Sequence, residues 1–432
     1  MFELKAKVEE LGRQVESDLK RANADLRKLP EIAEWRLSNF DAVDGLALKN
    51  LVDFLEITNL PQQTKNLFSD LPVTVFRARD FYIELLLWSH VTKTIHQHGF
   101  GGAFRVVLGS SLHTRYQFRT DRRVNDDFLV GKVAALGSES LPLGSVRRID
   151  PGFEGLVHSL YHLDNPSISL VVRDRGHSAF GPQYSYFPPA LALHWRSLES
   201  DELVSMFSRL IDLTSKLDRA LFRDLWRDRI AQLEFPRLAW LLLTHSSKLE
   251  NEELEAFRHR AHAVHGDLIF PLLESVEESA DQQLLVRIRE RIHDPDLRFF
   301  VALLMNVPDR SDILKMVSER FPGHDPINCC AGWLARLSVD EQSAERRIKE
   351  VMQMIEAAGK GAMQFSRQLR RALPAGVDVA SAEALFRQFI RGEGDASVTP
   401  GLSGVSLGGG ASFMALAAIP QWAALRPSSS GA

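Results

Sequence analysis

Three histidines have the residue type and the spacing of a metal site. One residue separates His96 from His98, so in an extended strand both side chains point to the same face, about 6.6 Å apart. Two imidazoles leave a divalent metal short of ligands, and a third ligand must come from another strand. The best third ligand is His158, within residues 155–162. The pattern predicts a metal site made of His96, His98 and His158.

Two more side chains are candidates for the substrate side of this site. His162 shares a strand face with His158 but lies about 13 Å further along an extended strand, too far for one metal to take both. We expect His162 to orient a ligand or move a proton. Arg173 has two readings that the sequence leaves open. It is either an anion clamp opposite the metal, because a guanidinium matches a carboxylate, or a strand-end salt bridge.

Other groups of reactive residues have a simpler interpretation. His113 is expected in the core or at the surface, with lining of the pocket as the less favoured alternative. Three histidines at steps of three lie along one face of a predicted helix: His259, His262 and His265. A polar helix face rich in arginine is a better interpretation of this spacing than a metal site. The adjacent Cys329 and Cys330 open a helix among apolar residues, where cysteines commonly serve as small packing residues.

The elements that must position the predicted metal ligands are short strands. Seven runs rich in β-branched and aromatic residues stand between glycine and polar turns: VTVF, FYIELLLW, AFRVVL, HTRYQF, SVRRI, LVHSLYHL and SISLVV. Strands of this length at this spacing indicate a small antiparallel barrel or sandwich, over residues 71–190.

Helices are predicted before and after the barrel segment in the sequence. Apolar residues at steps of three and four predict one helix over residues 2–28, ended by Leu29-Pro30, and a second over 43–57, within a helical segment 1–70. In residues 200–395, apolar residues recur at steps of three and four almost throughout, which predicts helices. There, two His-Asp-Pro sequences stand 31 residues apart, each opening a helix, an interval that suits stacked hairpins of the solenoid kind. Residues 396–432 are a Gly/Ser/Ala-rich tail. The fold class is therefore α+β and multidomain.

Composition excludes several classes of protein. The 432 residues include 52 basic and 56 acidic side chains with no long basic block, which argues against nucleic acid as a partner. The only two cysteines are adjacent, which excludes a disulfide framework and a cysteine-ligated zinc module. The first residues do not follow the plan of a signal peptide, and no apolar stretch approaches ~20 residues. We expect a cytoplasmic protein with no membrane segment.

Residues 71–189 resemble the cupin superfamily. His96-x-His98 followed by Gly109 looks like the first cupin motif, and Gly155-x2-His158-x3-His162 looks like the second. The phrase LLLWSHVTKTIHQHGFGGAFRVVLG is most similar to the thiol dioxygenases, in which three histidines hold iron(II) and the metal activates dioxygen beside a bound thiol.

The resemblance also implies which metal and which arginine to expect. The glutamate of the first cupin motif is replaced here by Gly102 or Ala103, which suits a three-histidine iron(II) site better than a four-ligand manganese site. Manganese, nickel and zinc stay open. The arginine that grips the substrate carboxylate in the thiol dioxygenases would correspond to Arg77 or Arg79.

Two functions follow as hypotheses. The first is an iron(II)-dependent oxygenase whose partners are dioxygen and a small anionic substrate, with His96, His98 and His158 as ligands. The alternative is a non-catalytic sensor or scaffold, in which the helical half binds a protein partner. A carrier-linked or peptide-linked substrate, delivered to the barrel by the helices, would combine the two.

Overall fold

The structure is a computed structural model, and it describes most of the chain up to residue 339. The described residues are 2–41, 60–63, 69–88, 94–152, 155–175, 183–194, 198, 200–307 and 309–339. The helix expected over residues 43–57 and the tail expected over 396–432 lie outside these ranges.

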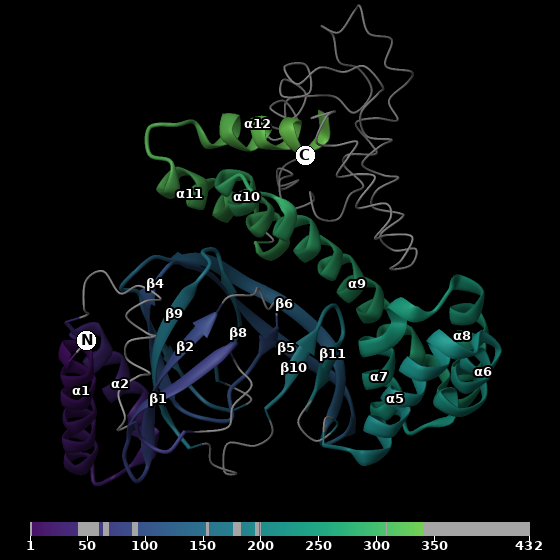
Figure 1. Cartoon of the computed structure of the whole chain (residues 1–432), viewed down its shortest axis with the longest axis horizontal. Helices are drawn as coiled ribbons and strands as arrows, with labels where there is room; N and C mark the ends of the chain where they lie inside the picture. Colours follow the sequence, from purple (N-terminus) through teal and green to yellow (C-terminus); the bar gives the residue numbers. More distant parts are fainter. Residues whose placement is uncertain are drawn as a thin grey trace, which may run out of the picture.

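Two antiparallel sheets form the centre of the molecule (Figure 1). The first has the order β1 (Leu71–Arg77), β2 (Phe81–Trp88), β9 (Ser167–Asp174), β4 (Gly102–Leu108) and β7 (Val146–Ile149). The second is a closed barrel in the order β10 (Ser185–Phe187), β11 (Leu191–Leu193), β6 (Phe128–Leu141), β5 (Ser111–Asn125), β8 (Val157–His162) and β3 (Ile95–His96), with β3 pairing back to β10. All seven predicted strand runs overlap observed strands, so the predicted antiparallel barrel is confirmed.

The inner strands of the five-stranded sheet, β2, β9 and β4, are buried on both faces. Along β2, Ile83 and Leu85 belong to a core shared with the N-terminal helices, whereas Leu86 belongs to a separate core inside the β region. Alternate residues of a strand point to opposite faces, so this sheet separates the two cores. A strand covered on both faces can be apolar at nearly every position, which explains the run FYIELLLW.

The N-terminal helices cover the outer face of this sheet. They are α1 (Phe2–Arg21) and α2 (Leu29–Ser38), joined by a 3₁₀ turn, and not the single helix predicted over residues 2–28. The helix breaks where Asn23 and Ala24 adopt positive φ angles of 55° and 56°. Pro30 then stands in the first turn of α2, where its missing N–H has no helical partner to lose.

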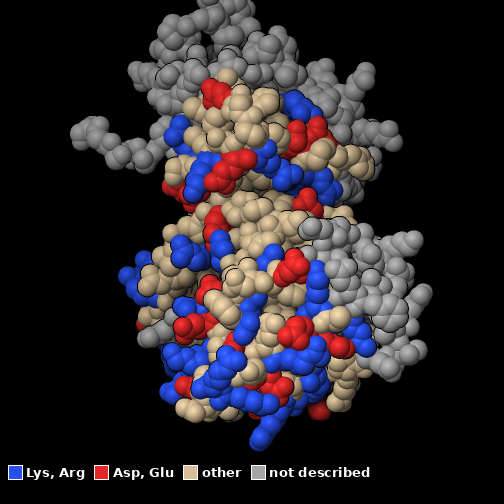
Figure 2. Space-filling model, turned by 90° about the vertical axis from the view of Figure 1, so that its left-hand side faces the viewer, with Lys and Arg blue, Asp and Glu red and all other residues tan. Residues whose placement is uncertain are grey.

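The outward face of α1 carries paired charges. Lys5 pairs with Glu9 at 3.6 Å and Lys20 with Glu16 at 3.2 Å, both one helical turn apart. On this side of the molecule, basic and acidic residues are interspersed (Figure 2). The charge pattern of α1 is therefore that of a solvated helix face opposite its apolar face.

Helices occupy the described chain after the barrel: α5 (Glu202–Leu217), α6 (Arg219–Asp224), α7 (Phe235–His245), α8 (Asn251–His265), α9 (Ile269–Arg291), α10 (Pro295–Asn306), α11 (Arg310–Arg320) and α12 (Pro326–Val339). As predicted, both His-Asp-Pro sequences open helices, because Asp294 and Asp325 accept bonds from backbone N–H groups of the first turns of α10 and α12. The solenoid arrangement stays a prediction. No helix of the described residues is long and apolar enough to cross a membrane.

The helices share packing contacts with the barrel. Phe128, Leu191 and Leu193 of the barrel belong to one apolar core with α5–α9. The buried Arg289 of α9 donates to the carbonyl of Leu163 at 2.9 Å, directly after β8. Because β8 carries His158, the helices brace a strand of the predicted metal site from outside.

Candidate metal centre

A cavity lies between the two sheets, and the predicted histidines line it. The cavity and its opening to solvent hold about 650 Å³ of empty space. The lining residues are Leu86, Trp88, Thr94, His96, His98, Phe100, Phe104, Ile149, His158, Leu160, His162, Ser169, Val171 and Arg173. The wall is mainly apolar and aromatic, with a few convergent polar groups, which is the usual make-up of a small-molecule site.

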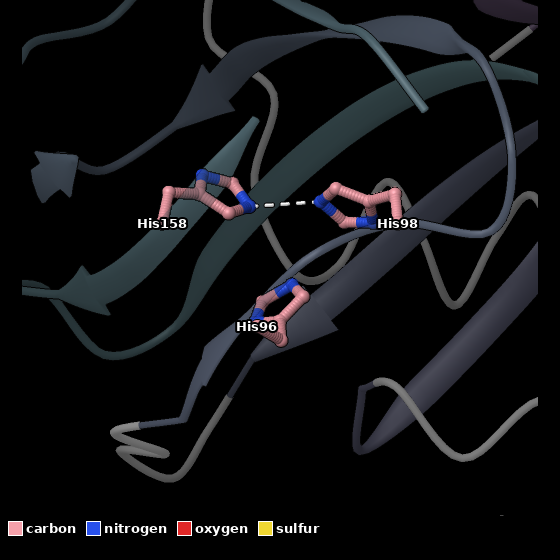
Figure 3. Close-up of side chains that lie close together, drawn as sticks. All are labelled: His96, His98 and His158. Atoms are coloured by element: carbon pink, nitrogen blue, oxygen red, sulfur yellow. Dashed lines mark hydrogen bonds between the residues drawn. The ribbon is translucent and has the colours of Figure 1, made fainter. Parts of the chain in front are cut away.

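The structure brings His96, His98 and His158 together (Figure 3). One ring nitrogen of each lies within 4.8 Å of those of the others, and the Nε2 atoms of His98 and His158 are 2.8 Å apart. The antiparallel pairing of β3 with β8 places His96 opposite His158. β3 ends at His96, so His98 reaches the group from irregular chain and not from the strand that the sequence predicted.

The three rings fit a metal ion. Two imidazole nitrogens that bind one ion at right angles, each at ~2.1 Å, lie about 3 Å apart, close to the separation of the two Nε2 atoms. His96 donates from Nδ1 to the carbonyl of Thr94 at 3.1 Å, so the lone pair of its neutral ring is on Nε2. Burial lowers the pKa of His96, and lowers those of His98 and His158 strongly, so the imidazoles are neutral and able to ligate. This group could therefore bind a metal.

His162 lines the same cavity but is not a member of the three-histidine group. Its ring stacks on the indole of Trp88 with centroids 4.6 Å apart, and its Nδ1 atom is 3.0 Å from the hydroxyl of Ser111. Burial lowers the pKa of His162 to about 3. The side chain is thus a fixed, neutral imidazole in the cavity wall.

Arg173 lies between the cavity and a buried carboxylate, and its role as an anion clamp stays a prediction. It lines the cavity from β9, and its Nη1 atom lies 3.9 Å from a carboxylate oxygen of the fully buried Glu84. Its guanidinium also stacks over the ring of Phe100, 3.6 Å from the centroid. A buried cation at the cavity wall is therefore held in place by a carboxylate and an aromatic face.

Arg77 and Arg79, which the family resemblance suggested, are not brought to the cavity. Arg77 ends the edge strand β1 and donates to the carbonyl of Gln62 at 3.0 Å. The side chain of Arg79 is 93% exposed and lies near Asp80. Because β9 pairs with β2 in the interior of the sheet, Arg173 is the arginine of these three that reaches the cavity.

His113 has a closer relation to the site than the sequence indicated. It is buried on β5, and its Nε2 atom lies 2.9 Å from the Nδ1 atom of His158. Its own Nδ1 atom lies 2.8 Å from a carboxylate oxygen of Glu139. A histidine and a glutamate at cross-strand positions are a weak signal without knowledge of the strand pairing, which is why the sequence did not single out this contact.

The remaining candidates stay outside the site. His265 bonds to the carbonyl of Ala231 at 3.2 Å and His262 faces Asp267 at 3.4 Å, so these two take different partners. Cys329 and Cys330 are both free thiols, and burial raises the pKa of Cys330 to about 12. Both results agree with a structural role for these residues.

Comparisons with known proteins give limited similarity. No family model and no curated protein sequence matches the chain. A solved structure of hydroquinone 1,2-dioxygenase from Sphingomonas sp. TTNP3, with 4-hydroxybenzoate bound, is similar over 26% of this chain and 70% of that chain, at 13% identity and a TM-score of 0.19. A structure from work on the DMSP lyases RdDddP and RnDddQII is similar over 38% of this chain and 93% of that chain, at 14% identity and a TM-score of 0.20.

Proposed function

We propose that this protein is a metal-dependent oxygenase of the cupin type, with iron(II) held by His96, His98 and His158. The observation that carries the proposal is the convergence of three neutral imidazoles, from β3, from the chain directly after it and from β8, on one point in a mainly apolar cavity. Three neutral ligands leave the charge of a divalent ion uncompensated, which favours an anionic substrate. Bound iron(II) would supply open coordination positions for dioxygen and substrate.

Arg173 would bind the anionic group of the substrate. The guanidinium sits in the cavity wall on the same sheet face as Leu86, and Phe100 and Glu84 restrict its rotation. A planar cation fixed in this way can take a carboxylate through two parallel hydrogen bonds. The apolar lining, including Phe104 and Val171, would exclude water from the bound substrate.

His162 would accept a hydrogen bond from the acidic group of the substrate. Its ring is neutral and is held by the Trp88 stack and by the Ser111 hydroxyl at Nδ1. When Nδ1 donates to the Ser111 hydroxyl, Nε2 carries the lone pair and can accept a hydrogen bond from a thiol, hydroxyl or enol of the substrate. A thiol is the substrate that the resemblance to the thiol dioxygenases implies, and other small anions that contain an acidic proton suit the same wall.

The first test is the metal content of protein purified without oxygen, for the wild type, His96→Ala and His158→Ala. The proposal expects near-stoichiometric iron in the wild type and its loss in both variants, with circular dichroism spectra unchanged. A screen of oxygen uptake over small thiols and carboxylates would then identify the substrate. A wild-type protein that takes up no metal, even after reconstitution with iron(II), would overturn the proposal and leave the scaffold alternative.

A further inference from the structure

A chain of hydrogen bonds runs from the Nδ1 atom of His158 to the protein surface. The Nε2 atom of His113 lies 2.9 Å from that Nδ1 atom, and the Nδ1 atom of His113 lies 2.8 Å from Oε1 of Glu139. Arg147 donates hydrogen bonds to both carboxylate oxygens of Glu139, with its Nε atom 2.8 Å from Oε1. His113 is buried, whereas the side chains of Glu139 and Arg147 are 38% and 35% exposed.

When the ring of His113 carries one proton, the chemistry of its partners fixes the direction of each bond. Arg147 lowers the pKa of Glu139, so this carboxylate is ionised and can only accept. His113 must then donate from Nδ1, and a neutral His113 has only a lone pair left on Nε2. His158 must therefore donate from its own Nδ1 atom, which leaves the lone pair of His158 on Nε2. That nitrogen is the one that faces His98.

We propose that His113 and Glu139 are positioning residues of the metal centre, which hold His158 in the tautomer that has its proton on Nδ1. The inference rests on the proposed metal site, since the tautomer matters because it leaves Nε2 free to ligate. In many metal sites a carboxylate hydrogen-bonds to a ligating histidine and orients its ring. Here the imidazole of His113 stands between the carboxylate of Glu139 and the ring of His158.

The strand pairing shows that this chain of contacts is built into the barrel. His113 and Glu139 are directly opposed across β5 and β6, and β5 pairs with β8 on its other side. The ring of His113 also packs edge-on to Phe104 of the cavity wall, with centroids 6.4 Å apart. The contact to His158 thus depends on three adjacent strands and not on a mobile surface side chain.

The tautomer can be measured without any metal. Ring ¹⁵N chemical shifts of the metal-free protein distinguish a protonated from an unprotonated nitrogen, and the inference expects protonated Nδ1 and unprotonated Nε2 in His158. In His113→Leu, which removes the acceptor, a large share of His158 should change to the Nε2-protonated form. In His113→Gln, whose amide oxygen can occupy the place of Nε2, the wild-type tautomer should persist.

Metal affinity gives the second measurement, with Co²⁺ as the probe. His113→Leu should raise the Kd for Co²⁺ by about 10- to 100-fold, and Glu139→Gln should raise it by a smaller factor. His113→Gln should lie close to the wild type. Thr114→Val is the matched control, because Thr114 neighbours His113 on β5 but bonds to Ser138 and to the Asn306 carbonyl. It should leave both the Kd and the His158 shifts unchanged.

The two proposals fail in different ways. If the wild type binds no Co²⁺ or iron(II), the proposed function is wrong, while the ¹⁵N shifts still decide the role of His113. If the wild type binds metal but His113→Leu keeps both the tautomer and the Kd within twofold, the positioning role is wrong and the metal site stands. If His113→Leu does not fold, the comparison of Glu139→Gln with wild type decides in the same manner.

Discussion

The Nε2 atoms of His98 and His158 lie 2.8 Å apart, although 60 residues of sequence separate the two histidines. Between two neutral imidazoles, one Nε2 atom donates and the other accepts, whereas a divalent ion can bind the lone pairs of both atoms at once. The arrangement is therefore that of two ligands which a bound ion would hold more firmly than a hydrogen bond does.

Metal binding should stabilise the protein against heat. At a free Co²⁺ concentration 100 times the Kd, the native state should gain about 2.7 kcal/mol, measured as a rise in Tm by calorimetry. His98→Ala should abolish this gain. Mg²⁺, which prefers oxygen ligands, should have no effect and serves as the control ion. An equal rise in Tm for His98→Ala would place the bound ion elsewhere on the protein.

Replacing Arg173 should destabilise the fold through Glu84. Glu84 is fully buried, and the Arg173→Met variant removes a cation that lies 3.9 Å from its carboxylate. The free energy of unfolding should fall by about 3 kcal/mol, because a buried charge loses its compensation. Adding Glu84→Gln to this variant should recover most of the lost free energy of unfolding. Both are measured by urea unfolding of the metal-free protein.

The control for this pair is a surface ion pair of the same kind. Arg148 lies 3.0 Å from Asp150, with both side chains nearly half exposed. Arg148→Met should therefore change the free energy of unfolding by less than ~1 kcal/mol. If the double variant of Arg173 and Glu84 were no more stable than Arg173→Met alone, compensation of Glu84 would not be the role of the arginine in the fold.

The sequence predicted well what depends on local pattern. Runs such as FYIELLLW predicted strands because β-branched and aromatic residues fill both faces of a covered sheet, and β2 has the bounds of that run. The spacing of His96 and His98 predicted that the two side chains point to the same place. In the structure they do, although His98 lies just after the end of β3. The choice of His158 as third partner also agrees with the group that the structure brings together.

What the sequence did not predict depends on which strands are neighbours. β6 has the sequence FLVGKVAALGSESL, in which Gly131 and Gly137 interrupt any regular alternation of apolar and polar residues, so no strand was predicted there. Glu139 lies on this strand, and with β6 missing its contact to His113 could not be foreseen. The choice between Arg77 and Arg173 likewise depends on the order β1-β2-β9, which no spacing along the chain encodes.

The packing of α1 on the sheet can be tested at Gly12. A Cβ atom added to Gly12 would lie 2.5 Å from the Cγ atom of Phe76 on β1. Gly12→Ala should therefore lower the free energy of unfolding by about 1–3 kcal/mol, through overpacking. In a Phe76→Ala background the clash is absent, and the same substitution should instead stabilise the protein by about 1 kcal/mol, because alanine is the better helix former.

This reversal of sign is measured by urea unfolding of the four proteins in the cycle. It separates packing from helix propensity, because propensity contributes equally in both backgrounds. If Gly12→Ala stabilised the protein in both backgrounds, α1 would not be packed against β1 as the structure has it.

The stability of the protein should depend on pH through His162. Burial lowers the pKa of this histidine to about 3 in the native state, whereas the unfolded chain has the ordinary value near 6.5. Between these values the unfolded state binds the extra proton, so stability is fully present above pH 6.5 and is lost as the pH falls toward 3. From pH 7 to pH 5 the loss due to His162 should be about 2 kcal/mol.

His162→Asn removes this titration and should lose about 2 kcal/mol less than the wild type over the same pH range. Urea unfolding of both metal-free proteins at pH 7 and pH 5 measures the difference. His98 and His158 titrate in both proteins, so their contributions cancel in the comparison. Equal losses for the two proteins would mean that His162 accepts a proton in the native state at pH 5. The ring would then not be the neutral, desolvated imidazole in the cavity wall on which its proposed role depends.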